Sequence, residues 1–330
     1  MREESPLDKG RRTLHVIRAA ATAVATGIVA ALVGRTTTHG ETGPEISVDA
    51  TGFGRIHDLG ADPAMGNTYA ATYNGVWLIP TGALPETYLN GAQRNVETKP
   101  RQIGGWAQDT MGFTVVKPGL LLASRHSDPV EEPTLNPPNL GLISSTDGAE
   151  TWTSIPLHGE TDFHDLDAVV LNGGELRVYG YDASDGTVKI SDDSGVTWSS
   201  GAIVSARDLA ADPSNPDRIF ATTLHGVVVS EDVGQSFAEV TDAPLLFLID
   251  AIDLQSGGGF IGIDPDGVVW RKCAVAGTWS KTGQAEGVPK ALGYVGGSAP
   301  WILVADQRGI VASDDYGASW TILVPEDRAA

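Results

Sequence analysis

The chain has 330 residues, with 42 acidic and 22 basic side chains, and its formal net charge at pH 7 is −20. A surface this acidic repels phosphate backbones, so we predict no nucleic-acid partner and favour cations or basic partners. The single cysteine, Cys273, excludes an intramolecular disulfide and a zinc site of the Cys₄ or Cys₂His₂ type.

The N-terminal 44 residues differ from the rest of the chain. Three arginines, Arg11, Arg12 and Arg18, precede 16 uncharged residues that run from Ala19 to Gly34. A basic flank followed by an apolar core is typical of a secretory signal or of a short membrane anchor. No Ala-x-Ala cleavage site follows, which favours an uncleaved anchor. We therefore expect export, membrane contact through this segment alone, and a polar linker over residues 36–44.

An eight-residue pattern, Ser-x-Asp-x-Gly-x-Ser/Thr-aromatic, occurs four times downstream. The copies begin at Ser145, Ser191, Ser230 and Ser313, and the first has Ala149 in place of the glycine. The pattern predicts a tight turn between two strands, in which the Asp carboxylate accepts backbone N–H groups and the Gly takes a positive φ. We expect the closing aromatic residues to be mostly buried against neighbouring sheets. They are Trp152, Trp198, Phe237 and Trp320.

A glycine four residues before each of three of these serines extends the repeat and reveals two degenerate copies. Six repeats result, with the eight-residue pattern or its remnant starting at positions 79, 145, 191, 230, 271 and 313. Each repeat has room for four short strands, and no helical periodicity is present after Glu45. The sequence therefore predicts an all-β fold, a six-bladed β-propeller over residues 45–325, with residues 326–330 as a tail. We expect a monomer.

The extra length of the second repeat lies at His126–Asn139, where four prolines oppose strand pairing. In a four-stranded blade the repeated turns join strands three and four, so they lie at one end of the propeller. The insertion and the starts of the innermost strands then lie at the opposite end, where binding residues usually collect.

Aligning the innermost strands places Asp at one position in five of the six repeats. His57-Asp58, His164-Asp165 and Arg207-Asp208 correspond, and Asp109 and Asp250 also fit. Two interpretations remain open: each Asp binds local backbone N–H groups, or the carboxylates form a cation or ligand site near the central channel. Three histidines, His57, His126 and His164, fall at the same end, so a divalent cation is a possible cofactor, and structural histidines are the other open interpretation.

The repeats resemble the Asp-box, or BNR repeat, of sialidases and related propellers. Residues 45–325 also resemble a bacterial group of exported Asp-box propellers described as glycosyl hydrolase-like or sialidase-like. The segments His57–Gly60, Gln108–Phe113, Leu140–Ile143 and Asp162–His164 carry this likeness. The Arg-Ile-Pro signature of true sialidases is absent, because Arg55-Ile56 is followed by His57.

The resemblance implies carbohydrate binding at the end opposite the repeated turns, and hydrolysis would need two carboxylates beside the scissile bond. We predict Asp58 and Asp109 as the catalytic pair. The predicted ligand-binding residues are His57, His126, His164, Asp165, Arg207, Asp208 and Asp250. The alternative is a non-catalytic propeller that binds a protein at the cell surface.

Overall fold

The computed structural model describes residues 52–326, apart from 63–64, 89–93, 106, 127–138, 156, 158, 275–276 and 298. The chain divides into two compact units, 1–45 and 46–330, and every described residue belongs to the second. The predicted export segment and linker lie outside the described residues, as does most of the proline-rich insertion. Within the described part of the chain, no helix is long and apolar enough to cross a membrane.

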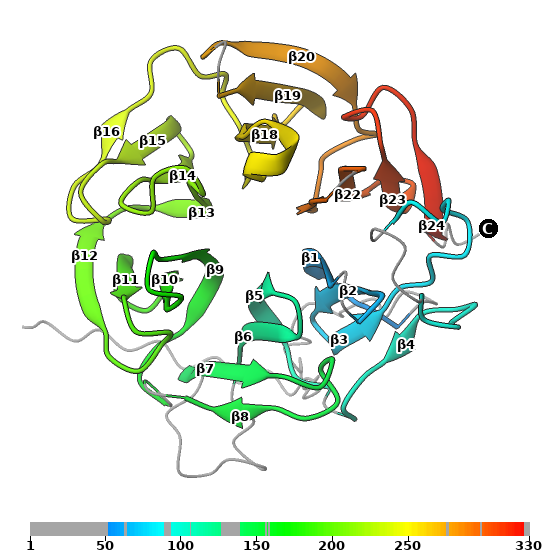
Figure 1. Cartoon of the computed structure of the whole chain (residues 1–330), viewed down its shortest axis with the longest axis horizontal. Helices are drawn as coiled ribbons and strands as arrows, with labels where there is room; N and C mark the ends of the chain where they lie inside the picture. The colour runs from blue at the N-terminus through cyan, green and yellow to red at the C-terminus, as the bar shows by residue number, and fades with distance from the viewer. Residues whose placement is uncertain are drawn as a thin grey trace, which may run out of the picture. The chain divides into compact units, whose positions relative to one another are not determined.

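Six four-stranded antiparallel sheets surround a central channel, and each is made of four consecutive strands (Figure 1). The predicted all-β six-bladed propeller is confirmed. Blade 1 contains β1 (Ile56–Asp62), β2 (Asn67–Thr72), β3 (Gly75–Leu78) and β4 (Arg101–Gln102). Blade 2 contains β5 (Thr110–Lys117), β6 (Leu120–His126), β7 (Asn139–Ser145) and β8 (Thr153–Ser154). Blade 3 contains β9 (Phe163–Val170), β10 (Leu176–Asp182), β11 (Thr187–Ser191) and β12 (Ser199–Ile203).

The remaining blades repeat this order. Blade 4 contains β13 (Ala206–Ala211), β14 (Ile219–Thr223), β15 (Gly226–Ser230) and β16 (Ala238–Glu239). Blade 5 contains β17 (Leu248–Ala251), β18 (Gly259–Ile263), β19 (Val268–Cys273) and β20 (Trp279–Gln284), with a short 3₁₀ turn at Leu254–Ser256. Blade 6 contains β21 (Ala291–Val295), β22 (Trp301–Asp306), β23 (Gly309–Ser313) and β24 (Thr321–Pro325).

The hydrophobic core lies between neighbouring blades. Tyr69 of blade 1 packs with Phe113 and Leu140 of blade 2 in one buried cluster. Another cluster joins Leu59 of β1 to Ala291 of β21 and Leu303 of β22. Apolar packing between the first and last blades therefore closes the ring without any exchange of strands. The second strands of the blades, such as β6 and β22, are buried along almost their whole length and carry runs of apolar residues.

The four repeated turns have one hydrogen-bond pattern. In the copy that begins at Ser191, the Ser191 hydroxyl donates to Asp193 at 2.9 Å and accepts the Gly195 N–H at 2.8 Å. Asp193 also accepts the Thr197 N–H and hydroxyl, at 2.7 and 2.6 Å. Equivalent bonds form in the copies that begin at Ser145, Ser230 and Ser313. The glycine position has a positive φ in every copy, as predicted, including φ 72° at Ala149.

The closing aromatic residues are mostly buried, as expected, although none is fully buried. All four pack against the edges of core clusters. Trp198 shows the reason: its ring contacts Phe163 at a centroid distance of 5.4 Å, while its Nε1–H donates to the Gly195 carbonyl at 2.9 Å. The ring thus packs on the core with one side while its polar edge binds the turn.

Candidate functional site

The first residues of the inner strands surround one end of the central channel, which we call the mouth. In three blades a β-bulge lies just before the aspartate of the inner strand, where one residue of that strand has no partner in the second strand. The strand register shifts between Ile56 and Asp58 in blade 1, between Phe163 and Asp165 in blade 3, and between Ala206 and Asp208 in blade 4. The bulged residues are His57, His164 and Arg207. A bulge adds one residue to a strand and turns it away from the sheet, so these side chains line the mouth.

The structure places one residue of each blade at this level. In blade 2 the register shifts between Thr110 and Phe113, which makes Met111 the bulged residue. In blades 5 and 6 the corresponding residues lie directly ahead of β17 and β21. We call the resulting set the mouth ring: His57, Met111, His164, Arg207, Phe247 and Lys290. All six line one cavity of about 550 Å³.

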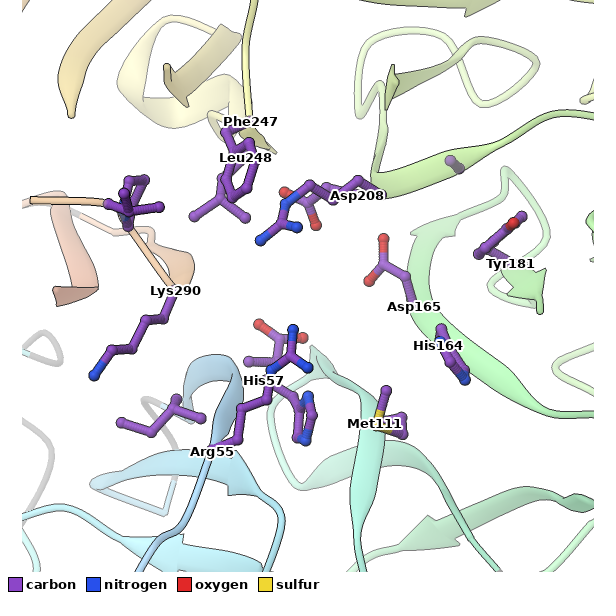
Figure 2. Close-up of a pocket in the computed structure, with 16 residues that line it drawn as sticks. Arg55, His57, Met111, His164, Asp165, Tyr181, Asp208, Phe247, Leu248 and Lys290 are labelled. Carbon is purple, nitrogen blue, oxygen red and sulfur yellow. The ribbon is translucent and has the colours of Figure 1, made fainter. Parts of the chain in front are cut away.

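Three carboxylates lie one residue deeper in the channel, and we call them the aspartate layer: Asp58, Asp165 and Asp208. Asp165 and Asp208 point toward the open centre (Figure 2). Asp165 accepts the Leu209 N–H of blade 4 at 2.5 Å, and Asp208 accepts the Ile249 N–H of blade 5 at 2.7 Å. These carboxylates therefore join neighbouring blades through backbone hydrogen bonds as well as facing the cavity.

Enclosure in the channel changes the acidity of these groups. Burial raises the pKa of Asp165 to about 7. Burial, together with repulsion from Asp165, raises the pKa values of Asp58 and Asp208 well above the ordinary range. Near neutral pH the aspartate layer therefore holds protons that surface carboxylates would lose.

The predicted alignment of five aspartates is wrong for two of them. In blade 2 the bulge at Met111 makes Gly112 the structural counterpart of Asp58, whereas Asp109 lies three residues earlier, ahead of β5. In blade 5 the N–H that donates to the preceding blade belongs to Ile249, as it belongs to Leu209 in blade 4, so these two residues are equivalent. Asp250 follows Ile249 and therefore lies one level deeper than the aspartate layer. Asp250 instead matches Asp167, since each binds an N–H of the next blade, from Tyr294 and Ala211 respectively.

Asp109 belongs to a second group of side chains at the edge of the mouth. Its Oδ1 lies 2.9 Å from His57 Nε2, and its Oδ2 lies 3.3 Å from His126 Nδ1. The other nitrogen of His126, Nε2, lies 3.4 Å from Asp162 Oδ1, and Asp162 Oδ2 lies 3.1 Å from His164 Nε2. Histidines and carboxylates thus alternate across blades 1, 2 and 3, and we call these five residues the His–Asp chain.

The electrostatics of the His–Asp chain differ from those of the aspartate layer. Burial opposes ionisation of Asp109 and Asp162, but the imidazoles beside them outweigh it and lower both pKa values. The same contacts with Asp109 and Asp162 raise the pKa of His126 to about 9. These carboxylates are therefore ionised at neutral pH, next to carboxylates of the aspartate layer whose pKa values are raised.

Cationic and aromatic groups complete the lining. The Arg207 guanidinium carbon lies 3.4 Å from the centroid of the Phe247 ring, and burial lowers the pKa of Arg207. Arg55 also lines the cavity. Lys290 extends away from the centre (Figure 2) and pairs with Glu326 at 2.9 Å. The mouth therefore offers donors, acceptors and an aromatic face around one cavity.

The structure brings the predicted site residues to one end of the channel, although in different groups. The cavity is lined by His57, Asp58, His164, Asp165, Arg207 and Asp208. Asp109 and His126 belong to the His–Asp chain, and Asp250 lines a smaller space of about 140 Å³ deeper in the channel. Whether Asp58 and Asp109 are catalytic stays a prediction.

Sequence reasoning did not select Asp162, Phe247 or Tyr181 as site residues. Asp162 could have been found from its spacing, since it lies two residues before His164, and alternate residues of an extended segment share a side. No repeated signal marks Phe247, because its counterparts in the other blades are chemically different.

Comparisons with known proteins support the fold. No family model and no curated protein matches the chain. Among solved structures, the chain is similar to the GH74 enzyme of Niastella koreensis, with 16% identity and a TM-score of 0.50 over 81% of this chain and 37% of the other. It is also similar to the GH74 xyloglucanase of Xanthomonas campestris, with 17% identity and a TM-score of 0.50 over 81% of this chain and 38% of the other.

A third similar structure is a chain of a nidogen/laminin complex, with 12% identity and a TM-score of 0.54 over 77% of this chain and 90% of the other. This chain spans less than two fifths of the length of the two GH74 chains. At these identities the similarity concerns the propeller fold alone.

Proposed function

We propose that this protein is an exported β-propeller that binds a carbohydrate at the mouth. The observation that carries the proposal is the chemical variety of the mouth ring. Two residues farther along each inner strand, the equivalent positions of all six blades are apolar: Leu59, Phe113, Leu166, Leu209, Ile249 and Leu292. A position that only had to support the fold would be equally uniform, so the variety of the mouth ring indicates selection for a ligand.

The chemistry of the cavity suits a saccharide. Sugar hydroxyls both donate and accept hydrogen bonds, and the cavity supplies acceptors from Asp165 and Asp208 and donors from Arg55 and Arg207. The Phe247 ring, stacked under Arg207, offers an apolar face for the C–H side of a sugar ring. A volume of about 550 Å³ lies within the range of small-ligand sites. Two propellers of similar fold are GH74 enzymes, one of them a xyloglucanase, which also supports a carbohydrate ligand.

Hydrolysis would assign different roles to two carboxylates. Asp58, with its raised pKa, would donate a proton to the leaving group, and the ionised Asp109 would act as the partner base or nucleophile. The two imidazoles that contact Asp109 keep it ionised but also occupy both of its oxygens. We therefore propose binding as the main function and test hydrolysis separately.

A glycan array probed with the full chain tests binding. We expect a restricted set of oligosaccharides to bind, and Arg207→Ala and Phe247→Ala to weaken that binding by at least about tenfold, the effect of roughly 1.4 kcal/mol. The control is Val196→Ala at the opposite end, where the side chain is 60% exposed. Absence of glycan binding, or equal loss in the control, would contradict the proposal.

A screen of chromogenic glycosides tests hydrolysis. If the protein is a hydrolase, Asp58→Asn should abolish turnover while the bound glycan is retained, because the amide oxygen can still accept the Leu59 N–H. Turnover that survives in Asp58→Asn would remove Asp58 from the catalytic role without affecting the binding proposal.

The second candidate function is a non-catalytic propeller that binds a protein at the cell surface. The observation that favours it is the similarity to a chain of the nidogen/laminin complex, 90% of which is covered. Cross-linking on intact cells, followed by loss of the product in Arg207→Ala, would support this alternative if the glycan array is empty.

Export is the remaining part of the proposal. It is supported by the arginine-flanked apolar segment Ala19–Gly34. Removal of residues 1–35 should move the protein from the extracytoplasmic or membrane fraction to the cytoplasm. Cell fractionation of the full and the shortened chain measures this change.

A further inference from the structure

We propose that His126, Asp162 and His164 bind a divalent transition-metal ion at the edge of the mouth. The inference is independent of the glycan-binding proposal, because it concerns a different group of side chains and a different ligand. It rests on the convergence of three donor atoms, on an unsatisfied buried nitrogen, and on a carboxylate placed to orient one of the ligands.

The donor atoms are close enough to share one ion. One nitrogen of each imidazole and one oxygen of Asp162 all lie within 4.8 Å of one another. His126 Nε2 and His164 Nε2 lie 3.4 and 3.1 Å from the two oxygens of Asp162. A tetrahedral ion with bonds of about 2.1 Å holds its donors roughly 3.4 Å apart, so small side-chain adjustments would complete the coordination.

One buried nitrogen of this group has no hydrogen-bond partner among the described residues. His126 Nε2 is buried and makes no hydrogen bond with the described residues, since its 3.4 Å approach to Asp162 lacks hydrogen-bond geometry. A buried nitrogen without a partner is costly. A metal ion at this point would bind His126 Nε2 and the Asp162 carboxylate together.

Asp109 occupies the position of a residue that orients a ligand. Metal-binding histidines usually donate their second N–H to a carboxylate, which fixes the tautomer. Asp109 Oδ2 lies 3.3 Å from His126 Nδ1, so a proton on Nδ1 leaves Nε2 free to bind the metal. His57, whose side chain is only 8% exposed, lies 2.9 Å from the other oxygen of Asp109.

The local fold makes the site specific to blades 2 and 3. His126 ends β6, Asp162 lies directly ahead of β9, and His164 is the bulged residue of β9. His164 also lines the cavity, so the ion would lie beside the bound ligand of the mouth. Three protein ligands leave a fourth position for water or for a ligand oxygen.

The donor set identifies the class of ion. Two imidazoles and one carboxylate suit Zn²⁺, Co²⁺ and related ions, whereas Ca²⁺ and Mg²⁺ require oxygen ligands. Zn²⁺ is therefore the probe, Co²⁺ gives a spectroscopic signature of coordination, and Ca²⁺ serves as the negative control.

The experiment is a titration of the chelator-treated full chain with Zn²⁺, followed by calorimetry, with Co²⁺ absorption as a second measurement. We expect one tight site per chain and no Ca²⁺ binding. Asp109→Asn should weaken Zn²⁺ binding by about 10–100-fold, and His126→Ala, Asp162→Asn and His164→Ala by more than that. The control is His225→Ala, an exposed histidine at the turn between β14 and β15.

Folding of each variant is checked by circular dichroism, and a variant that unfolds is replaced by His126→Gln or His164→Gln. Zn²⁺ binding that is absent, or that is unchanged in the three ligand variants, would overturn the proposal and leave the cluster as an ion-pair network. Zn²⁺ binding that is weakened in Asp109→Asn and unchanged in His225→Ala would support the proposal.

Discussion

The two ends of the propeller use repetition differently. At the end that carries the repeated turns, four copies of one hydrogen-bond pattern join the third and fourth strands with the same Ser, Asp and Gly or Ala positions. At the mouth, the six equivalent positions have six side chains of five chemical types. The comparison indicates that the first end stabilises the fold and that the second is free to bind a ligand.

The most severe test of this comparison uses two residues of one strand, β13. Leu209 is 4% exposed and packs in the cluster between blades 3 and 4, whereas Arg207 lies in the mouth ring. Leu209→Ala should lower the free energy of unfolding by about 2–5 kcal/mol through lost burial and a cavity. Arg207→Ala should lower it by less than about 1 kcal/mol, the loss of its stacking on Phe247. Urea denaturation measures both, and equal effects would contradict the division between fold and site.

At the end with the repeated turns, Trp198 tests whether the aromatic residues serve the fold alone. Because the ring is only partly buried, Trp198→Ala should cost about 2–3 kcal/mol, less than the roughly 3–5 kcal/mol of a fully buried aromatic residue. Ligand affinity at the mouth should stay within a factor of about two, since the ring packs on Phe163 and binds the Gly195 carbonyl rather than lining the cavity. A loss of affinity at an unchanged melting temperature would show that the two ends are coupled.

Two carboxylates deeper in the channel, Asp250 and Asp167, should make the stability of the fold depend on pH. Burial raises the pKa of Asp250 to about 6, and burial with repulsion from Asp250 raises that of Asp167 to about 8. The folded state therefore binds more protons than the unfolded state between the ordinary value of 3.8 and about 8. Their contribution to stability is complete below the ordinary value and is lost as pH rises through 6 and then 8.

The matched variants are Asp250→Asn and Asp167→Asn, measured by thermal unfolding from pH 4 to pH 8.5. Asp250→Asn should flatten the lower part of the pH dependence by on the order of 1–2 kcal/mol. Asp167→Asn should flatten the upper part. Stability that instead rises with pH in both variants and in the parent would reverse the assigned pKa directions.

These tests also show which features the sequence could predict. The six-bladed fold follows from the repeats, because the interval between a Gly and the Ser of the turn recurs in three of the four copies and matches the five-residue third strands β15 and β23. The mouth was harder to predict, because a β-bulge adds a residue without leaving a repeated signal. The alignment therefore matched Asp109 with Asp58, whereas the strand register matches Gly112 with Asp58.

The depth of a side chain was equally difficult to predict. The order of residues in a repeat says which side of a strand a residue faces, but not how far down the channel it lies, and Asp250 is one level deeper than expected.

The smallest expected effect compares two copies of the repeated turn at nearly the same backbone angle. Gly234 has φ 74° and Ala149, at the equivalent position, has φ 72°. A Cβ at Gly234 would lie 3.5 Å from Ile190 and Val188, which is ordinary contact, so Gly234→Ala changes the backbone preference alone. The left-handed conformation costs about 1–2 kcal/mol for an L-residue, and the stiffer unfolded chain returns roughly 0.4–1 kcal/mol, which leaves a loss of about 0.5–1 kcal/mol.

Ala149→Gly is the reverse change, but it should not give the reverse result. Relief of the left-handed strain is offset by the more flexible unfolded chain and by the loss of a fully buried methyl group, worth about 0.8 kcal/mol. The three contributions nearly cancel, so the free energy of unfolding should change by less than about 0.5 kcal/mol. Chemical denaturation of both variants checks the pair. A large gain in Ala149→Gly would mean that the methyl group contributes nothing to the cluster around Tyr69 and Phe113. The deviation from the repeat at Ala149 would then be pure strain, whereas a balanced result shows that packing between blades 1 and 2 compensates for it.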